Sequence, residues 1–479
     1  MHYSKMLIDG KPVESLSGEL ITIYNPANHE PVAQVSVGGR EEARLALEAA
    51  RKAFPSWADT HSQWRGEILH ESARLVRQRA DDIATLLTLE QGKPLKDSRR
   101  EVLSSADVLD FYAEEGKRNF GQWVPCAFKD NRSLVIKQPI GVAAVITPWN
   151  LPVDLMAWKV GPALAAGCTV VAKPPSLAPL AATALIQAVN DAGAPPGVIN
   201  VVHGSGSIVG AELVENPISR KIAFTGETAT GRWIMEHAAK HIKRVSLELG
   251  GQSSFIVCSD ASIDKAVSSC AQRAFSNMGQ ICISVNRIYV AEEVADEFTS
   301  KLVDRTIKLK VGNGLDPGID LGPMFSEAQR QKTREHIDDA VQKGARILCG
   351  GREPEGEKYA NGFFFLPTVI ENVDHSMRVM REETFGPVAP VMHFRTLDEA
   401  IKLANDTEYG LAAYIFTNDL TTAIRAAEKL EAGGIGVNVN NVAEIQAPFG
   451  GWKQSGLGRE LGHYGLEEYF ELKHIRLGL

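Results

Sequence analysis

The first quarter of the chain changes from a short hairpin-like pattern to a helical one. Within residues 6–13, Asp9-Gly10 lies between short apolar runs, and this dipeptide favours a tight hairpin turn. From residue 41 to residue 118 apolar side chains recur at helical spacing, for example at Ala43, Leu47 and Ala50. The pattern therefore predicts a small hairpin followed by several amphipathic helices.

Short apolar runs and helical segments alternate between residues 161 and 250. Two runs before this region, 134–136 and 142–146, are predicted to be short buried strands, and the second ends at Thr147-Pro148. Within the region, strands are predicted over 169–172, 198–202 and 221–224, and helices over 178–192 and 228–241. Such alternation predicts a mostly parallel sheet covered by helices, with ligands at the carboxyl ends of its strands.

A second α/β region is predicted from about residue 251 to residue 436. Its strands are expected near 254–257, 287–290 and 388–394. A glycine-rich segment, 448–458, separates this region from a final strand-like tail over 469–477. The chain of 479 residues is long enough for about three domains.

Composition and charge narrow the class of protein. Hydrophobic residues make up 44% of the chain and charged residues 23%, which is typical of a soluble globular protein. A net charge of -8 argues against binding to nucleic acid or to an anionic membrane. The chain has no run of about 18 apolar residues, so no membrane-spanning helix is predicted. Six cysteines without a Cys-x-x-Cys pair, and a first segment without an apolar signal region, favour the cytoplasm.

Two glycine-rich turns follow predicted strands and are candidates for binding a phosphate. The first, Gly204 to Gly210, misses the Gly-x-Gly-x-x-Gly dinucleotide fingerprint by one residue. The second, Phe224 to Gly231, opens a predicted helix, whose free N–H groups and positive end suit an anion. Either turn could instead serve only to reverse the chain. The chain has no Walker A motif, so nucleotide hydrolysis has no support.

Cys282 lies between two isoleucines in the segment 275–284. A lone cysteine in apolar surroundings is more often an inert core residue than a nucleophile. The residues alone therefore leave both interpretations open and favour the inert one.

Glu248 is flanked by Leu247 and Leu249 in a strand-like run. Because a carboxylate is costly to bury, it is either paired structurally or kept with a raised pKa for proton transfer, and the residues do not decide between the two.

His237 and His241, four apart on a predicted helix, are weaker candidates for metal ligands, because no third ligand accompanies them. A solvated helix face is the favoured interpretation of the two histidines.

Six blocks of residues occur in an order that is more specific than any one of them. They are Thr147-Pro148-Trp149-Asn150, Phe224-Thr225-Gly226, Leu247-Glu248-Leu249-Gly250-Gly251, Gly279-Gln280-Ile281-Cys282, Glu382-Glu383-Thr384-Phe385-Gly386-Pro387 and Pro448-Phe449-Gly450-Gly451. Together they resemble the NAD(P)-dependent aldehyde dehydrogenase superfamily, and the resemblance covers essentially the whole chain. It implies an α/β fold with a Rossmann-type parallel-sheet cofactor domain, an α/β catalytic domain and a small bridging arm for oligomerisation.

The resemblance implies a catalytic role for three residues. Cys282 would attack the aldehyde carbon as a thiolate and form a thiohemiacetal. The side-chain amide of Asn150 and the backbone N–H of Cys282 would stabilise the oxyanion. After hydride transfer to the nicotinamide, Glu248 would activate water to hydrolyse the thioester and release a free acid. The presence of Glu248 makes a coenzyme A-dependent relative the poorer match.

The resemblance also implies a set of cofactor contacts. The residues expected there are Ile146, Thr147, Pro148, Trp149, Lys173, Ser176, Gly206, Gly226, Glu227, Leu249, Glu383 and Phe385. Ser176 stands where strict NAD users commonly carry glutamate, so it removes a repulsion of the 2′-phosphate, and Lys173 adds positive charge. Glu227 replaces the usual serine and should repel phosphate unless it turns outward or is paired. NADP is therefore expected to be accepted, and NAD is not excluded.

The substrate is the point on which the sequence departs from the branch that it resembles most, the succinic semialdehyde dehydrogenases. That branch holds the substrate carboxylate with two arginines, whose positions carry Trp158 and Ser276 here. The expected substrate pocket consists of Leu151, Leu155, Trp158, Ser276 and Phe449. This set favours a neutral aliphatic or aromatic aldehyde, and Asp154 would discourage an anionic one. The alternatives are a semialdehyde dehydrogenase that uses another cation, with Arg459 as first candidate, and a non-catalytic structural or binding protein.

The expected domains and partners follow from the same resemblance. Residues 1–118 and 138–250 would form the cofactor-binding domain, 251–446 the catalytic domain, and 119–137 with 459–479 the oligomerisation arm. The arm implies a homodimer or a homotetramer. The other expected partner is a small-molecule aldehyde, whereas nucleic acid, membrane and metal are not expected.

Overall fold

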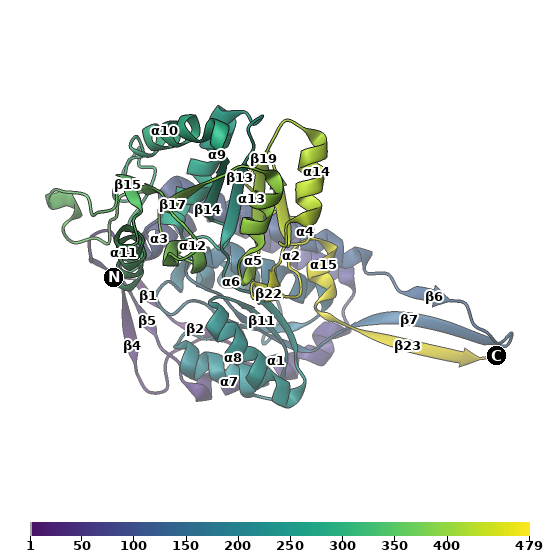
Figure 1. Ribbon diagram of the computed structural model, residues 1–479. Coiled ribbons are helices and arrows are strands. Elements are labelled where there is room, and N and C mark those ends of the chain that lie inside the picture. The colour runs from purple at the N-terminus through teal and green to yellow at the C-terminus, as the bar shows by residue number, and fades with distance from the viewer. Residues whose placement is uncertain (1) are drawn as a thin grey trace.

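The computed structural model describes residues 2–479, which form two lobes and a projecting arm (Figure 1). Each lobe is built on a largely parallel sheet, and the arm is a separate three-stranded antiparallel sheet. The N-terminus lies beside the lobes, whereas the C-terminus lies at the tip of the arm. Within residues 2–479 no helix has the length and apolar character needed to cross a membrane.

The first lobe contains an eight-stranded sheet. Its strands are β2 (Met6–Ile8), β3 (Lys11–Val13), β8 (Val142–Ile146), β9 (Thr169–Lys173), β10 (Ile199–Val201), β11 (Ser219–Thr225), β12 (Arg244–Glu248) and β22 (Gly456–Leu457), in the order β22-β12-β11-β8-β9-β10-β2-β3. Strands β8 to β12 are parallel. Because β8 lies between β9 and β11, the order reverses at β8 and β11, and a crevice is expected at their carboxyl ends.

Successive residues of these strands face opposite layers of helices. The helices of this lobe are α1 (Arg40–Ala58), α2 (Ser62–Gln78), α3 (Ala80–Gln91), α4 (Leu95–Glu115), α5 (Pro152–Ala166), α6 (Leu180–Asp191), α7 (Ala211–Glu215) and α8 (Thr228–Ala238). In β8, Ala143 and Val145 pack in the core shared with α2 to α6, whereas Val142, Ala144 and Ile146 pack in the core shared with α1, α7 and α8. Because helices cover both faces of the sheet, all residues of β8 face an apolar core, and all of them are apolar.

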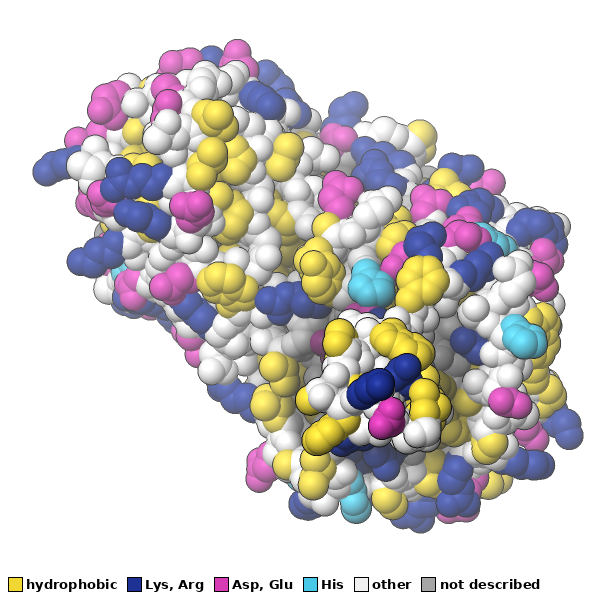
Figure 2. Space-filling view, turned by 90° about the vertical axis from the view of Figure 1, so that its right-hand side faces the viewer, with side chains coloured by type: hydrophobic (Ala, Val, Ile, Leu, Met, Phe, Trp, Pro, Cys, Tyr) yellow, Lys and Arg dark blue, Asp and Glu magenta, His cyan; other side chains and the backbone are white. Residues whose placement is uncertain are grey.

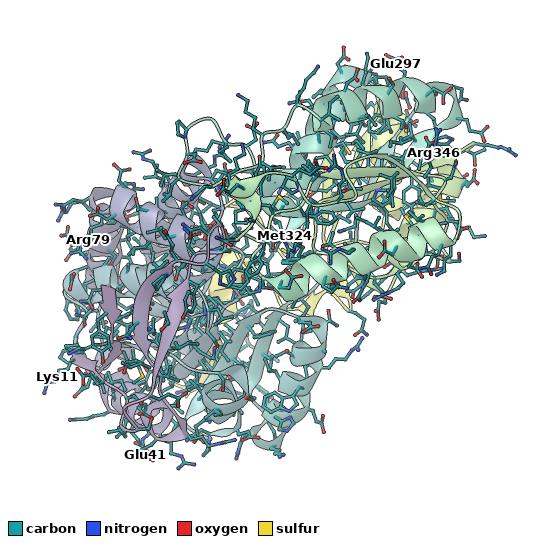
Figure 3. The ribbon with its side chains drawn as sticks, turned by 90° about the vertical axis from the view of Figure 1, so that its left-hand side faces the viewer. Lys11, Glu41, Arg79, Glu297, Met324 and Arg346 are labelled. Carbon is teal, nitrogen blue, oxygen red and sulfur yellow. The ribbon has the colours of Figure 1, made fainter. Side chains whose placement is uncertain are left out.

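The second lobe is built on a seven-stranded sheet. Its strands are β13 (Ser253–Val257), β14 (Val285–Ala291), β15 (Arg346–Cys349), β16 (Thr368–Glu371), β17 (Val388–Phe394), β19 (Ala412–Phe416) and β20 (Gly434–Val437), in the order β15-β16-β17-β14-β13-β19-β20. β15 is antiparallel to β16, and the other pairs are parallel. Its helices are α9 (Ile263–Phe275), α10 (Ala295–Thr306), α11 (Glu327–Gln342), α12 (Arg378–Arg381), α13 (Leu397–Asn405) and α14 (Leu420–Lys429). Met324, just before α11, is buried between the two lobes (Figure 3).

The chain passes directly from the first sheet to the second. β12 ends at Glu248 and β13 begins at Ser253, so residues 249–252 form the whole connection. Much later in the chain, β22 pairs antiparallel with β12 and places Gly456 opposite Glu248. The glycine-rich segment 448–458 therefore completes the first sheet beside Glu248, which is more than the separating role expected of it.

The arm consists of β6 (Gln122–Val124), β7 (Asn131–Pro139) and β23 (Phe470–Gly478). β23 pairs antiparallel with β7 over its full length, from Phe470 opposite Pro139 to Gly478 opposite Asn131. The prediction of a short buried strand over 134–136 is wrong in length and in burial, because these residues are the middle of β7 and are partly exposed. Three apolar residues in a row do not show how far a strand extends or what covers it.

The remaining elements are small. β1 (His2–Ser4), β4 (Leu20–Tyr24) and β5 (Pro31–Ser36) form a three-stranded sheet, β18 (Tyr409–Gly410) pairs with β21 (Trp452–Lys453), and α15 (Gly462–Glu467) leads into the arm. The predicted hairpin is present as β2 and β3, with Asp9 and Gly10 at positive φ in its turn. The predicted α/β fold with parallel sheets is confirmed. The helix predicted over 228–241 ends earlier, at Ala238, and continues as a 3₁₀ turn to His241.

Candidate active site

The residues expected in the site gather where the carboxyl ends of the first sheet meet the second lobe. Ile146 ends β8, Lys173 ends β9 and Glu248 ends β12. Directly after β8 come Thr147, Pro148, Trp149 and Asn150, and directly after β11 come Gly226 and Glu227. The last two groups border the crevice at which the strand order reverses.

Cys282 lies on a loop between α9 and β14, residues 276–284, whose backbone is unusual. Asn277, Met278 and Gly279 all have positive φ, at 50°, 59° and 70°. Residues with a side chain disfavour this region, so the shape of the loop depends on support from its surroundings. A Cβ atom on Gly279 would lie 2.2 Å from the carbonyl oxygen of Gly386. The Cys282 loop is thus packed tightly against the segment that precedes β17.

The Cys282 thiol lies in an environment that disfavours its anion. Burial raises its pKa to about 12, and the carboxyls of Glu248 and Glu383 act in the same direction. The thiol is therefore protonated at neutral pH when no ligand is bound. Burial also raises the pKa of Cys168 and Cys270, but Cys282 is the cysteine that lines the large cavity described below. This position distinguishes it from the inert core cysteines.

Glu248 is a buried carboxyl with 3% of its surface exposed. Burial raises its pKa well above the usual range, and the neighbouring carboxyl of Glu460 raises it further. Glu460 is paired with Lys159 at 2.7 Å, and the charge of Lys159 acts on Glu248 in the opposite direction. The Oε2 atom of Glu248 has no hydrogen-bond partner within residues 2–479. A buried carboxyl without a structural partner suits proton transfer better than a purely structural role.

Asn150 is buried, and the Cys282 loop orients its side chain. Its Nδ2 donates to the carbonyl oxygen of Gln280 at 3.1 Å. Because a primary amide has two N–H groups, this bond sets the plane of the amide and leaves a second N–H as a donor. The structure thus places a fixed amide donor next to the loop that carries Cys282.

Lys173 and Ser176 lie together at the end of β9. The Lys173 ammonium donates to the carbonyl oxygen of Pro174 at 3.2 Å and to Ser176 Oγ at 3.5 Å. Burial lowers the pKa of Lys173 to about 8, and no carboxylate within residues 2–479 pairs with it. Lys173 is a buried amine whose hydrogen-bond partners are all neutral. A phosphate or a ribose hydroxyl of a bound ligand would supply a further partner.

The two glycine-rich turns differ in how open they are. A Cβ atom on Gly206 would meet no other atom within 4 Å, so the backbone there is accessible. A Cβ atom on Gly226 would lie 2.4 Å from the ring of Phe224, so packing within the chain already requires glycine at this position. Leu249 packs on Gly231 of α8, where a Cβ atom would lie 2.5 Å from the leucine.

Glu227 is exposed just before the N-terminus of α8 and caps none of its N–H groups. Its carboxylate makes no hydrogen bond or ion pair within residues 2–479, and its charge raises the pKa of Glu383. A positive partner that would neutralise Glu227 is therefore absent from the described chain, and an anion at this helix end would meet its negative charge.

The second lobe contributes Glu383 and Phe385. Glu383 Oε1 accepts from the N–H of Gly251 at 2.9 Å, and burial raises the pKa of its carboxyl to about 7. Phe385 has a positive φ of 53°, and its ring meets that of Trp149 edge to face with centroids 5.6 Å apart. The residues expected to bind the cofactor thus come from both lobes.

A cavity of about 310 Å³ lies beside Cys282. It is lined by all five residues expected in the substrate pocket, namely Leu151, Leu155, Trp158, Ser276 and Phe449. The rings of Trp158 and Phe449 meet edge to face with centroids 5.2 Å apart and form an apolar wall. The structure therefore brings the expected pocket and the expected nucleophile together.

The same cavity is more charged than the sequence analysis predicts. Arg273 of α9 and Arg100 of α4 both line it. Arg273 donates through Nε to the carbonyl oxygen of Asn440 and through Nη2 to Asn441 Oδ1 at 3.3 Å, and its Nη1 has no partner within residues 2–479. Arg100 pairs with Asp97 at 3.1 Å. Sequence reasoning missed Arg273, although it precedes Ser276 by three positions, a spacing at which side chains share a face of a helix. The helix that carries it, α9, is not among the predicted helices.

Asp154 and Arg459 differ in their position relative to this cavity. Asp154 lines the cavity, accepts weakly from Ser104 (3.3 Å) and Ser105 (3.4 Å), and has its pKa raised to about 7 by burial. Arg459 does not line the cavity, and its Nη1 donates to the carbonyl oxygen of Gly458 at 2.6 Å. Arg459 is therefore replaced by Arg273 as the first candidate for a cation in the pocket.

His237 of α8 is engaged in other contacts, whereas His241, in the turn after α8, is exposed. The ring of His237 stacks on Trp233 with centroids 3.9 Å apart, and its Nδ1 bonds to the carbonyl oxygen of the same tryptophan. Within residues 2–479 no three His, Cys, Asp or Glu side chains are arranged to hold a metal ion.

Comparison with known proteins gives a family and close relatives. The model of the aldehyde dehydrogenase family matches residues 13–475. The chain is 47% identical to the NADP(+) succinate-semialdehyde dehydrogenase of Escherichia coli, over 99% of this chain and 97% of the relative. It is 46% identical to the glutarate-semialdehyde dehydrogenase of Pseudomonas putida, over 98% and 96%. The crystal structure of an NADP-dependent enzyme from E. coli superimposes with a TM-score of 0.98 at 46% identity, covering 100% of this chain and 98% of the other.

The raised pKa of Cys282 predicts how fast it is alkylated. Because the thiolate is the reactive form and its fraction rises tenfold per pH unit below the pKa, the rate with iodoacetamide should rise about tenfold per unit from pH 7 to pH 10. The measurement is cofactor-free alkylation followed by peptide mass spectrometry, with Cys282→Ala as the background for the other thiols. A plateau near pH 9, as for an ordinary thiol, would contradict the environment described here.

Proposed function

The chain belongs to the aldehyde dehydrogenase family, and we propose that it oxidises an aldehyde with an anionic group at its far end to the corresponding carboxylic acid. Proteins of this family are oxidoreductases that act on the aldehyde group. The presence of Arg273 in the same cavity as Cys282 is the observation that carries the choice of substrate.

In the proposed reaction Cys282 attacks the aldehyde carbon. The thiol releases its proton to water as the sulfur–carbon bond forms, and the carbonyl oxygen gains negative charge in the resulting thiohemiacetal. The free N–H of the Asn150 amide and the backbone N–H of Cys282 are the donors proposed to stabilise that charge. Loss of hydride from the same carbon then leaves a thioester on Cys282.

Glu248 is proposed to act after the hydride has left. In its ionised form the carboxylate takes a proton from a water molecule, whose oxygen attacks the thioester carbon, and the Cys282 sulfur leaves as the thiolate. The product is a free carboxylic acid. A raised pKa suits this task, because it moves the proton affinity of the carboxyl towards neutral pH, and the unpartnered Oε2 leaves an atom available for water.

NADP or NAD is the proposed cofactor, and when bound it supplies the hydride acceptor. Lys173 and Ser176 would hold the adenosine ribose and its 2′-phosphate, since the buried ammonium has no carboxylate partner within residues 2–479. Glu383 would accept from the nicotinamide ribose hydroxyls, and Trp149 with Phe385 would border the ring. The pair Lys173 and Ser176 favours NADP, whereas Glu227 would weaken the binding of either cofactor's pyrophosphate.

The substrate is proposed to carry an anion because of Arg273. Its Nη1 has no partner within residues 2–479, and the loop at Asn440 and Asn441 holds the other guanidinium nitrogens, so the group is oriented in advance. Both relatives described above are dehydrogenases of semialdehydes, in which a carboxylate lies at the far end of the aldehyde. Arg273 would thus replace the arginines that are missing at positions 158 and 276.

A neutral aldehyde is the second candidate, and the wall formed by Trp158 and Phe449 favours it. Burial of an aliphatic or aromatic tail against these rings would contribute about 25 cal/mol per Å² of apolar area removed from water. Asp154 also favours it, because its carboxyl becomes negative as the pH rises through about 7 and would then repel an anionic tail.

The proposed organisation assigns residues 1–118 and 138–250 to cofactor binding, 251–446 to catalysis, and 119–137 with 459–479 to subunit contact. Large apolar side chains on the arm, including Phe120, Trp123 and Leu472, are more than 60% exposed. Figure 2, which looks along the arm from its tip, shows hydrophobic side chains gathered there. A second copy of this chain would cover them, in a homodimer or a homotetramer.

The six free cysteines fit a reducing compartment, and we propose the cytoplasm.

Glu248→Gln should separate the two halves of the reaction. The amide keeps the shape of the side chain and removes the proton acceptor, so the first turnover should give a burst of NAD(P)H, and steady turnover should fall about 100-fold or more. Rapid mixing followed at 340 nm measures both phases, and Cys282→Ala, which should show neither, is the control. Unchanged steady turnover in Glu248→Gln would remove this residue from the mechanism.

Arg273→Gln should lower kcat/KM for succinic semialdehyde about thirtyfold or more, because losing one partner of a desolvated ion pair costs about 2–5 kcal/mol. For hexanal the change should stay within about threefold. Arg100→Gln is the matched control and should change neither substrate much, since Arg100 is largely exposed. Equal losses for both aldehydes would point to disruption of the loop at residue 440. A parent enzyme that already prefers hexanal would favour the second candidate.

The double change Trp123→Asp with Leu472→Asp should reduce the molar mass in solution by half or more. Two buried charges in an apolar contact between copies would strongly oppose association. Light scattering coupled to gel filtration measures the mass, and circular dichroism checks that the lobes stay folded. An unchanged mass would show that the arm makes no contact between subunits.

A further inference from the structure

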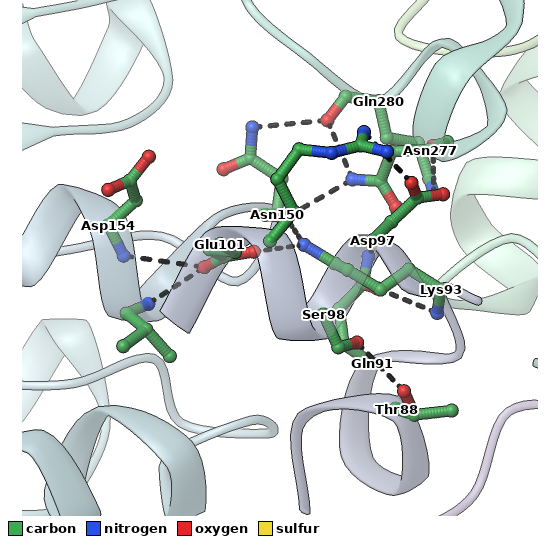
Figure 4. Close-up of polar contacts among 12 residues, drawn as sticks. Thr88, Gln91, Lys93, Asp97, Ser98, Glu101, Asn150, Asp154, Asn277 and Gln280 are labelled. Carbon is green, nitrogen blue, oxygen red and sulfur yellow. Dashed lines mark hydrogen bonds and ion pairs between the residues drawn. The ribbon is translucent and has the colours of Figure 1, made fainter. Parts of the chain in front are cut away.

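The corner between α3 and α4, residues 91–95, lies against the active site and carries Lys93. The Lys93 side chain is 2% exposed, and its Nζ donates to two groups. One is Glu101 Oε2 at 2.5 Å, and the other is the backbone carbonyl oxygen of Asn150 at 2.6 Å. A buried ammonium is therefore held between a carboxylate and the backbone of the proposed oxyanion donor (Figure 4).

Glu101 connects the same network to the helix that follows Asn150. Its Oε1 accepts from the backbone N–H of Val153 at 3.0 Å and from that of Asp154 at 3.4 Å. Both N–H groups belong to the first turn of α5, where no carbonyl of the same helix can accept from them. The N-cap residue of α5 makes no side-chain hydrogen bond to them either. Lys93 thus holds the turn at Asn150, and Glu101 holds it at Val153 and Asp154.

A second branch of the network reaches the Cys282 loop. Asn277 Nδ2 donates to the carbonyl oxygens of Asn150 (3.1 Å) and Gln280 (3.3 Å). Its Oδ1 accepts from Gln91 Nε2 at 3.0 Å, and Gln91 Oε1 accepts from the backbone N–H of Lys93 at 2.9 Å. Through these bonds the corner supports Asn277, one of the residues of the Cys282 loop that adopts a positive φ. Gln91, Lys93, Glu101 and Asn277 are called the Lys93 network below.

The corner is itself fixed by the second lobe. A Cβ atom on Gly314 would lie 2.4 Å from the carbonyl oxygen of Lys93, and one on Gly322 would lie 1.9 Å from that of Gly92. The N–H of Leu95 donates to the carbonyl oxygen of Gly314 at 2.9 Å. The backbone that carries Lys93 therefore has little freedom to move relative to either lobe.

From these contacts we infer that Lys93 is a positioning residue for aldehyde oxidation, which holds the backbone of Asn150 in place so that the second amide N–H meets the aldehyde oxygen. The inference rests on the proposed role of Asn150 as oxyanion donor. Lys93 bonds to the carbonyl of Asn150, and the amide bonds to Gln280, so the two ends of the residue are held by different segments. Without Lys93 the amide would be held at one end, and small errors in the position of a donor reduce rates steeply.

The test is a double-mutant cycle between Lys93 and Asn150. Lys93→Met, measured at saturating cofactor and aldehyde, should lower the rate of the NAD(P)H burst about 10- to 100-fold. Asn150→Ala should lower it at least as much. In the Asn150→Ala background, adding Lys93→Met should lower it by less than about threefold, because the two residues act through one interaction.

Two controls separate positioning from loss of structure. Lys96→Met removes an exposed lysine of α4, which pairs with Asp320 at 3.2 Å, and should leave the burst unchanged. Alkylation of Cys282 by iodoacetamide forms no oxyanion, so its rate should stay within about threefold in Lys93→Met. A burst and an alkylation rate that fall together would overturn the inference, because the whole site would then be disturbed.

The remaining outcomes are also distinct. Equal losses from Lys93→Met in both backgrounds, or a normal burst in Lys93→Met, would overturn the inference while leaving the role of Asn150 intact. A normal burst in Asn150→Ala would overturn that role and with it the inference. If Lys93→Met does not fold, Glu101→Gln replaces it in the same cycle, since the amide keeps an acceptor for α5 and loses the charge that holds Lys93. Its loss should be smaller, about fivefold, and should likewise vanish beside Asn150→Ala.

Discussion

The site depends on one close backbone contact, between Gly251 and the Cys282 loop. A Cβ atom on Gly251 would lie 2.3 Å from the carbonyl oxygen of Cys282, so no other residue fits at this point without moving the loop. The N–H of the same glycine donates to Glu383. One residue of the connection between the two sheets thus fixes two loops of the second lobe. Glu248 lies three residues before Gly251, so this contact also restricts where Glu248 can lie relative to the Cys282 loop.

Burial at this junction raises the pKa of three acidic groups. Cys282, Glu248 and Glu383 all have raised pKa values, and in each of them the main cause is removal from water. The shifts favour the neutral form of each group over its charged form, which opposes the build-up of three like charges in a small volume. The same exclusion of water strengthens each hydrogen bond that is made to developing charge. Burying these polar groups lowers the stability of the fold, and the packing of the two large apolar cores around the strands offsets this cost.

Periodicity and motif order predict the parts of this structure that are local in sequence. The hairpin at Asp9-Gly10, the alternating strands of the first sheet and the residues at their carboxyl ends all follow from short segments. Arg273 and the Lys93 network do not, because their roles arise from contacts between segments that are far apart in the chain. The middle of β7 is predicted as a buried strand for a related reason. Its apolar residues indicate that the strand prefers apolar neighbours, but whether such neighbours are present depends on tertiary or quaternary structure.

The first sheet combines strands from both ends of the chain, and this arrangement has a consequence for synthesis. β2 and β3 form one edge from residues 6–13, and β22 forms the other edge from residues 456–457. A ribosome that has made the first 250 residues has produced every central strand, yet the edge beside Glu248 is still open. An unpaired strand edge invites pairing with other chains. The nascent chain therefore exposes this edge until residues 456–457 have been made and can pair with β12.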